Sequence, residues 1–267
     1  AAGAAGTEGA AGAGLRWPVP VDVSDEEAVE TAVAAIEAEH GPVAGLVNAA
    51  GVLGKMHPPQ RLRMRDWDRE MAVDLRGTYL TCRAAGARMA ARGAGAIVNI
   101  ASVAGMSSAP VHGYGPAKAA VLNLTTTLAA EWGPRGVRVN AVSPGFTRTP
   151  ALEAAFASGA LAETELTRPA ALRRLVEPAE IARAVLWLLG PEAGAVTGAT
   201  SGLSQIQAGR FAALASGLAG DLQIRGSQPF GADHQGNHAV RVAHGAGFRS
   251  GSGILGHGWR GRQCQGQ

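Results

Sequence analysis

Between residues 15 and 200, short apolar runs alternate with longer amphipathic segments, an order that few folds accommodate. Strands that alternate with helices form a parallel sheet, with right-handed crossovers that place helices on both of its faces. The sequence therefore predicts an α/β fold. The predicted elements are a strand at 17–23, a helix at 24–41, a strand at 43–51, a helix at 66–93, a strand at 95–102, a helix at 114–133, a strand at 136–145 and a helix at 177–190.

Local signals mark the ends of the first predicted helix. Ser24 is a candidate N-cap and Glu27 completes a capping box with it, while Gly41 stands where a C-terminal glycine belongs. A different signal marks the strand at 95–102, because the run "GAIVNIAS" is apolar in the way that is typical of a central parallel strand buried on both faces.

The segments outside this alternating region differ from it in composition. Residues 1–14 are almost entirely Ala and Gly, which predicts a flexible segment. Residues 201–267 are rich in Gly, Gln, His and Arg, and we expect an atypical, poorly ordered tail. His234 and His238 in that tail form a possible metal pair, but no third ligand is evident, so no metal site is predicted.

Composition excludes several classes of protein. The 267 residues are 46% hydrophobic and 17% charged, which is typical of a globular domain with a substantial core. No apolar run reaches membrane-spanning length, and the first residues lack the pattern of a signal peptide. The two cysteines, Cys82 and Cys264, stand far apart and indicate no disulfide framework. We therefore expect a cytoplasmic protein without a membrane partner.

The basic balance of the chain does not by itself indicate a nucleic-acid partner. The formal net charge is +3 and the isoelectric point is near 9.3. The densest basic stretch, "RLRMRDWDRE" at 61–70, alternates with acidic residues, and this pattern favours a solvated helix face. Nucleic-acid association through the basic tail stays open as a weaker hypothesis, which salt-dependent binding to DNA would support.

Polar and small residues gather where the predicted strands end. One strand ends at Asn48, the next at Ser102 and the next at 143–145, and Tyr114 begins the helix that follows Ser102. The carboxyl ends of parallel strands share one edge of the sheet, and ligands of such sheets bind there. We therefore expect these groups to form one site.

Tyr114 and Lys118 are spaced so that they share one face of a helix. A free phenol has a pKa near 10, and an ammonium one helical turn away favours the phenolate and lowers that pKa. The Ser102 hydroxyl could hold a substrate oxygen beside the phenol. These groups suit proton transfer that is coupled to hydride transfer at a carbonyl or an alcohol.

At this point the sequence resembles the short-chain dehydrogenases/reductases over residues 17–200. The matching stretches are "NAAG" at 48–51, "IVNIAS" at 97–102, Tyr114-x-x-x-Lys118, "VNAVSPGFTRT" at 139–149, "EPAEIARAVLWLLG" at 177–190 and "VTGA" at 196–199. The resemblance implies a Rossmann-like parallel sheet and an oxidoreductase that interconverts a secondary alcohol and a ketone with NAD or NADP. It also implies a homo-oligomer.

The resemblance assigns expected roles to individual residues. Ser102 would orient the substrate oxygen, Tyr114 would be the acid/base, and Lys118 would lower the tyrosine pKa and hold the cofactor ribose. Asp74 stands where the family usually has an asparagine that positions a water for the proton relay. The residues expected to border the cofactor are Asp22, Val23, Asn48, Ala49, Ala50, Gly51, Pro144, Gly145, Thr147 and Thr149.

Simpler interpretations exist for single members of this set. Ser102 could cap the end of a strand, and Asn48 could be an ordinary turn residue. Thr149, before Pro150, could start a helix, and Asp22 could serve as a cap. Only the joint placement of the set favours the functional interpretation.

The sequence departs from the family at both ends. The family opens with a strand and a T-G-x-x-x-G-x-G turn that binds the pyrophosphate, and the glycines before residue 15 do not have that spacing. The family's first two strands therefore have no counterpart, so the sheet should be incomplete on that side. The resemblance stops again after "VTGAT" at 196–200.

These departures leave two consequences to test. They suggest a truncated or frame-shifted reading of a longer gene, and the alternative function is an incompetent remnant of the fold that acts as a partner subunit. We also expect the strand at 17–23 to pair directly with the strand at 44–48, with only weak dinucleotide binding as a result.

Overall fold

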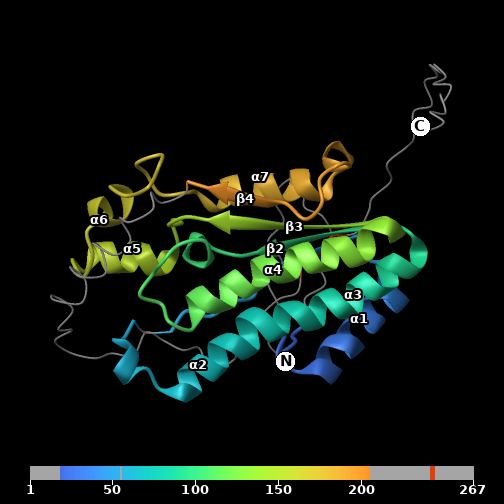
Figure 1. The fold of residues 1–267 in the computed structure, drawn as a ribbon, viewed down its shortest axis with the longest axis horizontal. Coiled ribbons are helices and arrows are strands. Elements are labelled where there is room, and N and C mark those ends of the chain that lie inside the picture. Colours follow the sequence, from blue (N-terminus) through green and yellow to red (C-terminus); the bar gives the residue numbers. More distant parts are fainter. Residues whose placement is uncertain (1–18, 55, 205–240, 244–267) are drawn as a thin grey trace, which may run out of the picture.

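A computed structural model describes residues 19–54, 56–204 and 241–243, and within them the chain forms a five-stranded sheet covered by helices (Figure 1). The strand order is β4-β3-β2-β1-β5. The first four strands are mutually parallel, as the alternating pattern predicts, while β5 pairs antiparallel with β1. The strands are β1 (Gly45–Asn48), β2 (Gly95–Ile100), β3 (Val137–Pro144), β4 (Thr200–Leu203) and β5 (Arg241–Ala243).

The helices confirm the four segments predicted from periodicity and add two short ones. The region at 150–176, which the sequence left without predicted elements, contains α5 and α6. The helices are α1 (Glu26–His40), α2 (Met64–Glu70), α3 (Thr78–Arg92), α4 (Tyr114–Trp132), α5 (Pro150–Ala157), α6 (Glu163–Thr167) and α7 (Pro178–Leu189), with a π-helical segment η2 (Met71–Gly77) and short 3₁₀ turns η1 (Pro59–Arg61), η3 (Val103–Gly105), η4 (Gly133–Arg135) and η5 (Pro191–Ala193).

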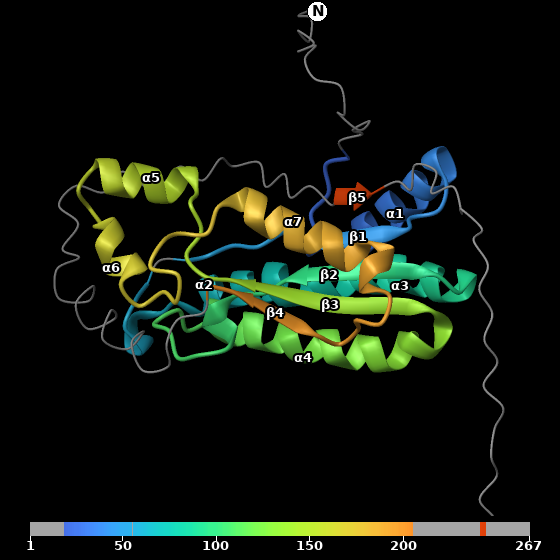
Figure 2. The same ribbon diagram turned by 90° about the horizontal axis from the view of Figure 1, so that it is seen from above.

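The sheet lies between two layers of helix. Figures 1 and 2 show α1, α3 and α4 on one face of the sheet and α7 on the other, with α5 and α6 beyond the carboxyl ends of the strands. The central strands β2 and β3 are buried along most of their length, as the apolar run at 95–102 predicts. On the α7 side, Val98 and Val142 pack against Val185 and Leu188.

The predicted start of the first helix is one residue wrong. Asp25 is the N-cap of α1, and its side chain accepts a hydrogen bond from the backbone N–H of Ala28. Ser24 instead donates its hydroxyl to Asp22 Oδ1 at 2.7 Å, so it lies in the turn before the helix. The predicted end is confirmed, because Gly41 follows the helix with φ at 85°, a conformation that favours glycine.

The predicted strand at 17–23 does not form in its described part. Residues 19–22 form no helix or strand, and a turn follows at 23–24. The edge of β1 away from β2 pairs with β5, so the prediction that this segment pairs with the strand at 44–48 is wrong. A strand requires a neighbouring backbone for its hydrogen bonds. Val21 and Val23 are nevertheless buried, and Val23 packs closely over Gly77. Burial of these valines explains the apolar pattern without a strand.

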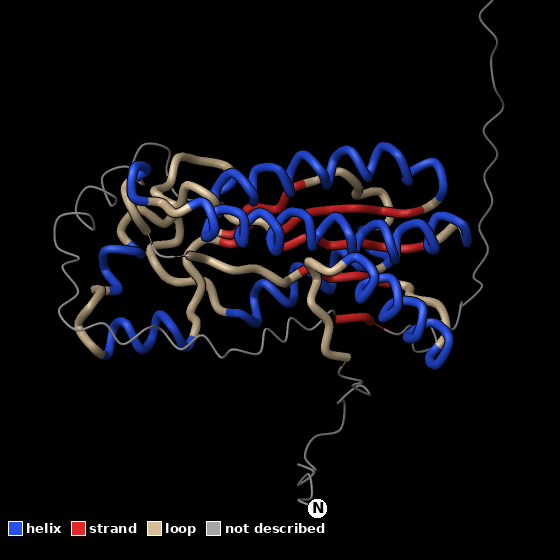
Figure 3. The backbone as a smooth tube through the Cα atoms, turned by 90° about the horizontal axis from the view of Figure 1, so that it is seen from below, coloured by secondary structure: helices blue, strands red, loops and turns tan. Residues whose placement is uncertain are grey.

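The tail expected at 201–267 lies mostly outside the described residues, and so do residues 1–14 and the His234–His238 pair. Two described pieces of that tail belong to the sheet, because β4 continues to Leu203 and β5 lies along β1 (Figure 3). Among the described residues, no helix combines the length and apolarity needed to cross a bilayer.

Helices α3 and α4 pack closely because glycine allows it. A Cβ atom on Gly86 of α3 would lie 2.3 Å from Cζ3 of Trp132, the last residue of α4. Both residues are buried in the main core. A side chain at Gly86 would push the two helices apart, because a packed core does not relax freely.

This contact gives a test of the fold. Gly86→Ala should lower the free energy of unfolding by about 1–3 kcal/mol, the usual cost of overpacking a core. Gly133→Ala is the matched control, since no atom lies within 4 Å of a Cβ built there. That control should change stability by less than about 0.5 kcal/mol. Urea denaturation measures both, and equal effects of the two substitutions would contradict the packing.

Candidate active site

The carboxyl ends of β1, β2 and β3 lie at one edge of the sheet, and the expected site residues follow them. Ser102 comes just after β2 and caps the short turn η3, where its hydroxyl accepts from the Ala104 N–H at 3.1 Å. Tyr114 is the first residue of α4, and Lys118 follows one turn later. The Ser102 hydroxyl also forms a hydrogen bond with the Tyr114 phenol. The structure therefore brings these three residues together.

Lys118 is buried and its ammonium has two polar partners. Nζ donates to the Ile100 carbonyl at 3.1 Å and lies 3.4 Å from Asp74 Oδ1. It also lies 5.5 Å from the centre of the Tyr114 ring. Burial lowers the pKa of Lys118, and the Asp74 carboxylate partly opposes that shift. The charge of Lys118 is thus directed mainly at Asp74 and at the end of β2.

Asp74 is fully buried in the π-helical segment η2. Its Oδ1 accepts from the Val52 N–H at 3.1 Å, whereas its Oδ2 has no hydrogen-bond partner among the described residues. Burial raises the pKa of Asp74 despite the nearby ammonium of Lys118. Gly51 is required beside it, because a Cβ at that position would lie 2.6 Å from Oδ1. π-Helical turns often occur at functional sites, and this one turns a carboxylate toward Lys118.

The pKa of Tyr114 shifts in the direction opposite to the one expected from the sequence. Burial raises it most, and the carboxylates of Asp74 and Glu70 raise it further, while the Ser102 hydroxyl lowers it. Lys118 was expected to lower this pKa, but its charge is paired with Asp74. Tyr114 is therefore held as the neutral phenol at neutral pH.

The Asn48 side chain points into the protein and joins strands to helices. Its Nδ2 donates to Asn99 Oδ1 at 2.8 Å and to Cys82 Sγ at 3.1 Å. Its Oδ1 accepts from the Thr81 hydroxyl at 2.7 Å, and Asn99 in turn donates to the Thr125 hydroxyl at 2.9 Å. The amide of Asn48 is thus satisfied internally, and it stabilises the end of β1.

Sequence reasoning missed the other members of this network. Asn99 lies directly opposite Asn48 in the parallel register of β1 and β2. An asparagine inside an apolar strand run was the available signal. Cys82 is fully buried, and burial raises the pKa of its thiol to about 12, so the thiol stays neutral. Its role here is to fill space and to accept from the Asn48 amide.

Several residues expected at the cofactor border line one small depression. Val23, Asn48, Ala49 and Ala50 are among them. The full lining is Val23, Val47, Asn48, Ala49, Ala50, Gly77, Thr78 and Thr81. Asp22 is close by in sequence, but its carboxylate accepts from the N–H and hydroxyl of Ser24. Gly77 is itself packed against Val23, since a Cβ there would lie 2.7 Å from Val23 Cγ2, so the depression is small.

The segment after β3 is held by its own hydrogen bonds. Gly145 donates its N–H to the Leu203 carbonyl at 2.8 Å, and a Cβ there would lie 2.6 Å from the Ser204 carbonyl oxygen. The Thr147 hydroxyl donates to the Gly145 carbonyl at 3.1 Å. Thr149 is the N-cap of α5, as its simpler interpretation predicts. Its hydroxyl, like that of Thr147, is used in shaping the loop next to Pro144.

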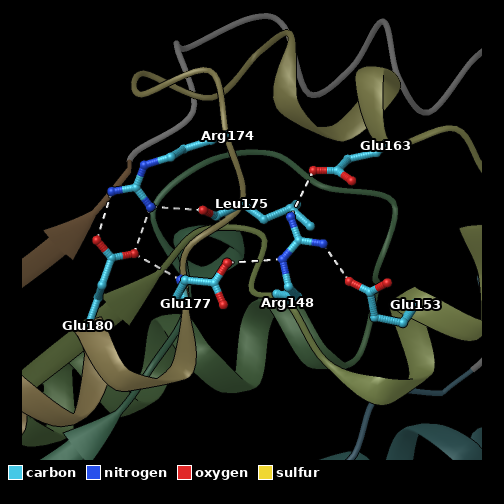
Figure 4. A network of polar contacts seen from close by, with 7 residues as sticks. All are labelled: Arg148, Glu153, Glu163, Arg174, Leu175, Glu177 and Glu180. Carbon is cyan, nitrogen blue, oxygen red and sulfur yellow. Dashed lines mark hydrogen bonds and ion pairs between the residues drawn. The ribbon is translucent and has the colours of Figure 1, made fainter.

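A cluster of charged residues fixes the helices that stand over this edge. Arg148 forms ion pairs with Glu153, with Glu163 at 3.0 Å and with Glu177 at 2.9 Å (Figure 4). Arg174 pairs with Glu180 through two hydrogen bonds of 2.7 Å, one from each of its terminal nitrogens. One arginine therefore forms ion pairs with α5, α6 and the N-cap of α7.

Comparison with known proteins identifies the family. The family model described as enoyl-(acyl carrier protein) reductase matches residues 3–203. The chain belongs to the short-chain dehydrogenase/reductase family. By family it is an NAD(P)-dependent oxidoreductase.

Two curated relatives of this short-chain dehydrogenase/reductase are named as polyol dehydrogenases. The D-threitol dehydrogenase of Mycolicibacterium smegmatis is 40% identical over 185 residues, which cover 67% of this chain and 68% of that protein. The galactitol 2-dehydrogenase of Cereibacter sphaeroides, which forms L-tagatose, is 42% identical over 191 residues, 70% of this chain and 74% of that protein.

Solved structures share the fold. A Brucella melitensis protein named ribose-5-phosphate isomerase is 51% identical, with a TM-score of 0.68, and the match covers 73% of this chain and 76% of that one. An NAD⁺-bound xylitol dehydrogenase is 28% identical, with a TM-score of 0.65, over 69% of this chain and 76% of that one. These matches confirm the Rossmann-like parallel sheet.

The Asp74 carboxylate can be tested by titrating Tyr114 directly. The sequence has two tyrosines, so Tyr79→Phe leaves Tyr114 as the only phenol to titrate. In that background Asp74→Asn should lower the pKa of Tyr114, because it removes a negative charge and releases the Lys118 ammonium. The ultraviolet absorbance of tyrosinate measures the shift.

The exposed Asp68 supplies the control for this prediction. Asp68→Asn makes the same chemical change on α2 and should leave the pKa of Tyr114 unchanged. An unchanged or raised pKa of Tyr114 in the Asp74→Asn variant would show that the carboxylate does not act on Tyr114.

Turnover gives a second test of Asp74. Because Asp74→Asn restores the amide usual in the family, turnover should be preserved or raised. A loss of about tenfold or more would show that the carboxylate has a role of its own.

Proposed function

We propose that the chain interconverts a secondary alcohol and a ketone by hydride transfer, with Tyr114 as the acid/base. The observation that supports this most is the meeting of Ser102, Tyr114 and Lys118 at the carboxyl edge of the sheet, where α/β proteins bind their ligands. The relatives named as threitol and galactitol dehydrogenases act on alcohols, which makes a polyol or a related small alcohol the substrate class to examine.

In this proposal each side chain has a distinct task at the substrate oxygen. The Ser102 hydroxyl donates a hydrogen bond to that oxygen and orients it toward the phenol. In reduction the neutral Tyr114 donates its proton to the oxygen, while in oxidation the phenolate accepts the proton of the alcohol. A bound nicotinamide would supply or take up the hydride. Since the pKa of Tyr114 is raised, proton donation is favoured at neutral pH and oxidation should increase as the pH rises.

The residues of the site fit part of a dinucleotide. The adenine end would lie near Asp22 and Val23, beside the small depression at 48–50, and Gly51 keeps the backbone near Lys118 free of side chains. Lys118 would hold the ribose, for which its ammonium would have to divide its contacts between the ribose and Asp74. Pro144, Gly145, Thr147 and Thr149 would border the nicotinamide. NAD or NADP is the cofactor class that we propose.

A second candidate function is an incompetent partner subunit with this fold. The observation in its favour is that Lys118 already has an ion pair with Asp74 and a hydrogen bond to Ile100, which satisfy the ammonium without a cofactor. Dinucleotide binding separates the two candidates.

Three expectations from the sequence stay predictions. They are the division of the chain at residues 14 and 200, the cytoplasmic location and the homo-oligomer. Size-exclusion chromatography with light scattering would test the oligomer.

Removal of the Tyr114 hydroxyl tests the proposed acid/base. Tyr114→Phe should lower kcat by at least about a hundredfold on an alcohol that the chain oxidises, the usual scale for the loss of an acid/base. The assay would follow the nicotinamide absorbance with threitol, galactitol and xylitol, and with ribose 5-phosphate to detect isomerisation. Tyr79→Phe is the control, since Tyr79 is 43% exposed on α3 and its substitution should leave kcat unchanged. Unchanged turnover in folded Tyr114→Phe would overturn the mechanism.

Cofactor affinity gives a separate prediction. The sequence holds no T-G-x-x-x-G-x-G turn to present backbone N–H groups to a pyrophosphate, so this chain should bind NAD⁺ and NADP⁺ with dissociation constants of about a millimolar or weaker. Calorimetry would measure this, and quenching of the five tryptophans offers a second readout. Micromolar binding would show that another segment supplies the phosphate site.

A further inference from the structure

A buried carboxylate outside the proposed machinery lies next to the acid/base. Glu70, the last residue of α2, is only 6% exposed, although the stretch at 61–70 predicts a solvated helix face. The arginines of that stretch are exposed as predicted, so Glu70 is the exception. A carboxylate is rarely buried without a partner that offsets the loss of hydration. The surroundings of Glu70 therefore indicate what it does.

The Glu70 carboxylate lies between two glycine backbones. Its Oε1 accepts from the Gly54 N–H at 2.6 Å, and a Cβ on Gly54 would lie 2.6 Å from the same oxygen. On the other side, a Cβ on Gly113 would lie only 2.0 Å from Oε2 and 3.5 Å from the Glu70 Cβ. Both neighbours must be glycine for the carboxylate to fit between them. The contact joins the turn after β1 to the residue just before Tyr114.

We propose that Glu70 is a positioning residue, which holds the 51–54 turn against the start of α4 and so fixes both the placement and the charge environment of Tyr114. The effect of Glu70 on catalysis rests on the proposed role of Tyr114, whereas its effect on the pKa of the Tyr114 phenol does not. Oε1 of Glu70 accepts a hydrogen bond from backbone and Oε2 lies against Gly113, so in this proposal Glu70 acts through Tyr114 and not on the substrate.

The charges around Tyr114 give this proposal a measurable consequence. The charged groups that face it are Glu70 from α2, Asp74 from η2 and Lys118 from its own helix. Glu70 raises the pKa of Tyr114 and that of Asp74. Glu70→Gln keeps an oxygen that can accept from Gly54 and removes the negative charge. A purely structural role would be preserved by this substitution, whereas the electrostatic role would be lost.

The first experiment titrates Tyr114 in the Tyr79→Phe background, without cofactor or substrate. Glu70→Gln should move the appearance of tyrosinate absorbance to lower pH. Glu131→Gln is the control, because the Glu131 side chain is 66% exposed on α4 and makes the same charge change far from the phenol. If Glu70→Gln leaves the pKa of Tyr114 unchanged, the proposal is overturned. Failure of the turnover test with Tyr114→Phe would leave this titration unaffected, so the two failures can be told apart.

The second experiment tests the geometry by a double-mutant cycle. Gly113→Ala alone should lower the Tm by about 2–8 °C, since its Cβ would overlap Glu70 Oε2. In the Glu70→Ala background the same Gly113→Ala change should cost much less, because the overlapping oxygen is gone. Equal costs of Gly113→Ala in both backgrounds would overturn the placement of Glu70 against Gly113, even if Glu70→Gln folds poorly.

Discussion

The ion pair between Lys118 and Asp74 is the interaction on which the edge of the sheet depends. An ammonium as buried as that of Lys118 must be paired and hydrogen-bonded, because removal of one partner would leave an uncompensated charge in the core. Asp74 and the Ile100 carbonyl meet this requirement. The pair joins η2, the end of β2 and the second turn of α4, and Asp74 also holds the turn after β1 through Val52. Four segments distant in sequence therefore share one charged contact.

Burial does most to raise the pKa of the Tyr114 phenol, and the balance of charge at this contact adds to that shift. Two carboxylates, Asp74 and Glu70, stand near Tyr114, and one ammonium opposes them. With an asparagine at position 74, Lys118 would act on the phenol with less competition and the pKa of Tyr114 would be lower. With the aspartate the neutral phenol is favoured, which suits a proton donor more than a base. In the proposed mechanism, the carboxylate at position 74 therefore favours proton donation by Tyr114 over proton acceptance at neutral pH.

The sequence predicts those elements that depend on local pattern. Its predictions fail where contacts with residues distant in sequence determine the structure. Periodicity and end signals located α1, α4, α7 and the buried strands β2 and β3, and Gly41 marked the end of α1. The valines at 21 and 23 are buried as an apolar run predicts, but a strand also needs a backbone partner, and β5 takes that place along β1. The motifs placed Ser102, Tyr114 and Lys118 together. They could not show that Asp74 takes up the charge of Lys118, or that Glu70 is covered by Gly54 and Gly113, because those contacts exist only in three dimensions.

The direction of β5 determines whether this strand could contribute to a phosphate-binding site beside β1. A phosphate site of the Rossmann kind needs a strand that ends at the carboxyl edge, so that the following turn and helix N-terminus face the ligand. β5 runs antiparallel to β1, with Arg241 opposite Val47 and Ala243 opposite Gly45. It therefore ends at the amino edge, away from Asn48 and the depression beside Val23. A strand in this place satisfies the backbone of β1, but a strand in this direction does not itself end at the carboxyl edge, where a pyrophosphate would bind. Completion of the sheet and completion of the cofactor site are thus separate requirements, and β5 meets only the first.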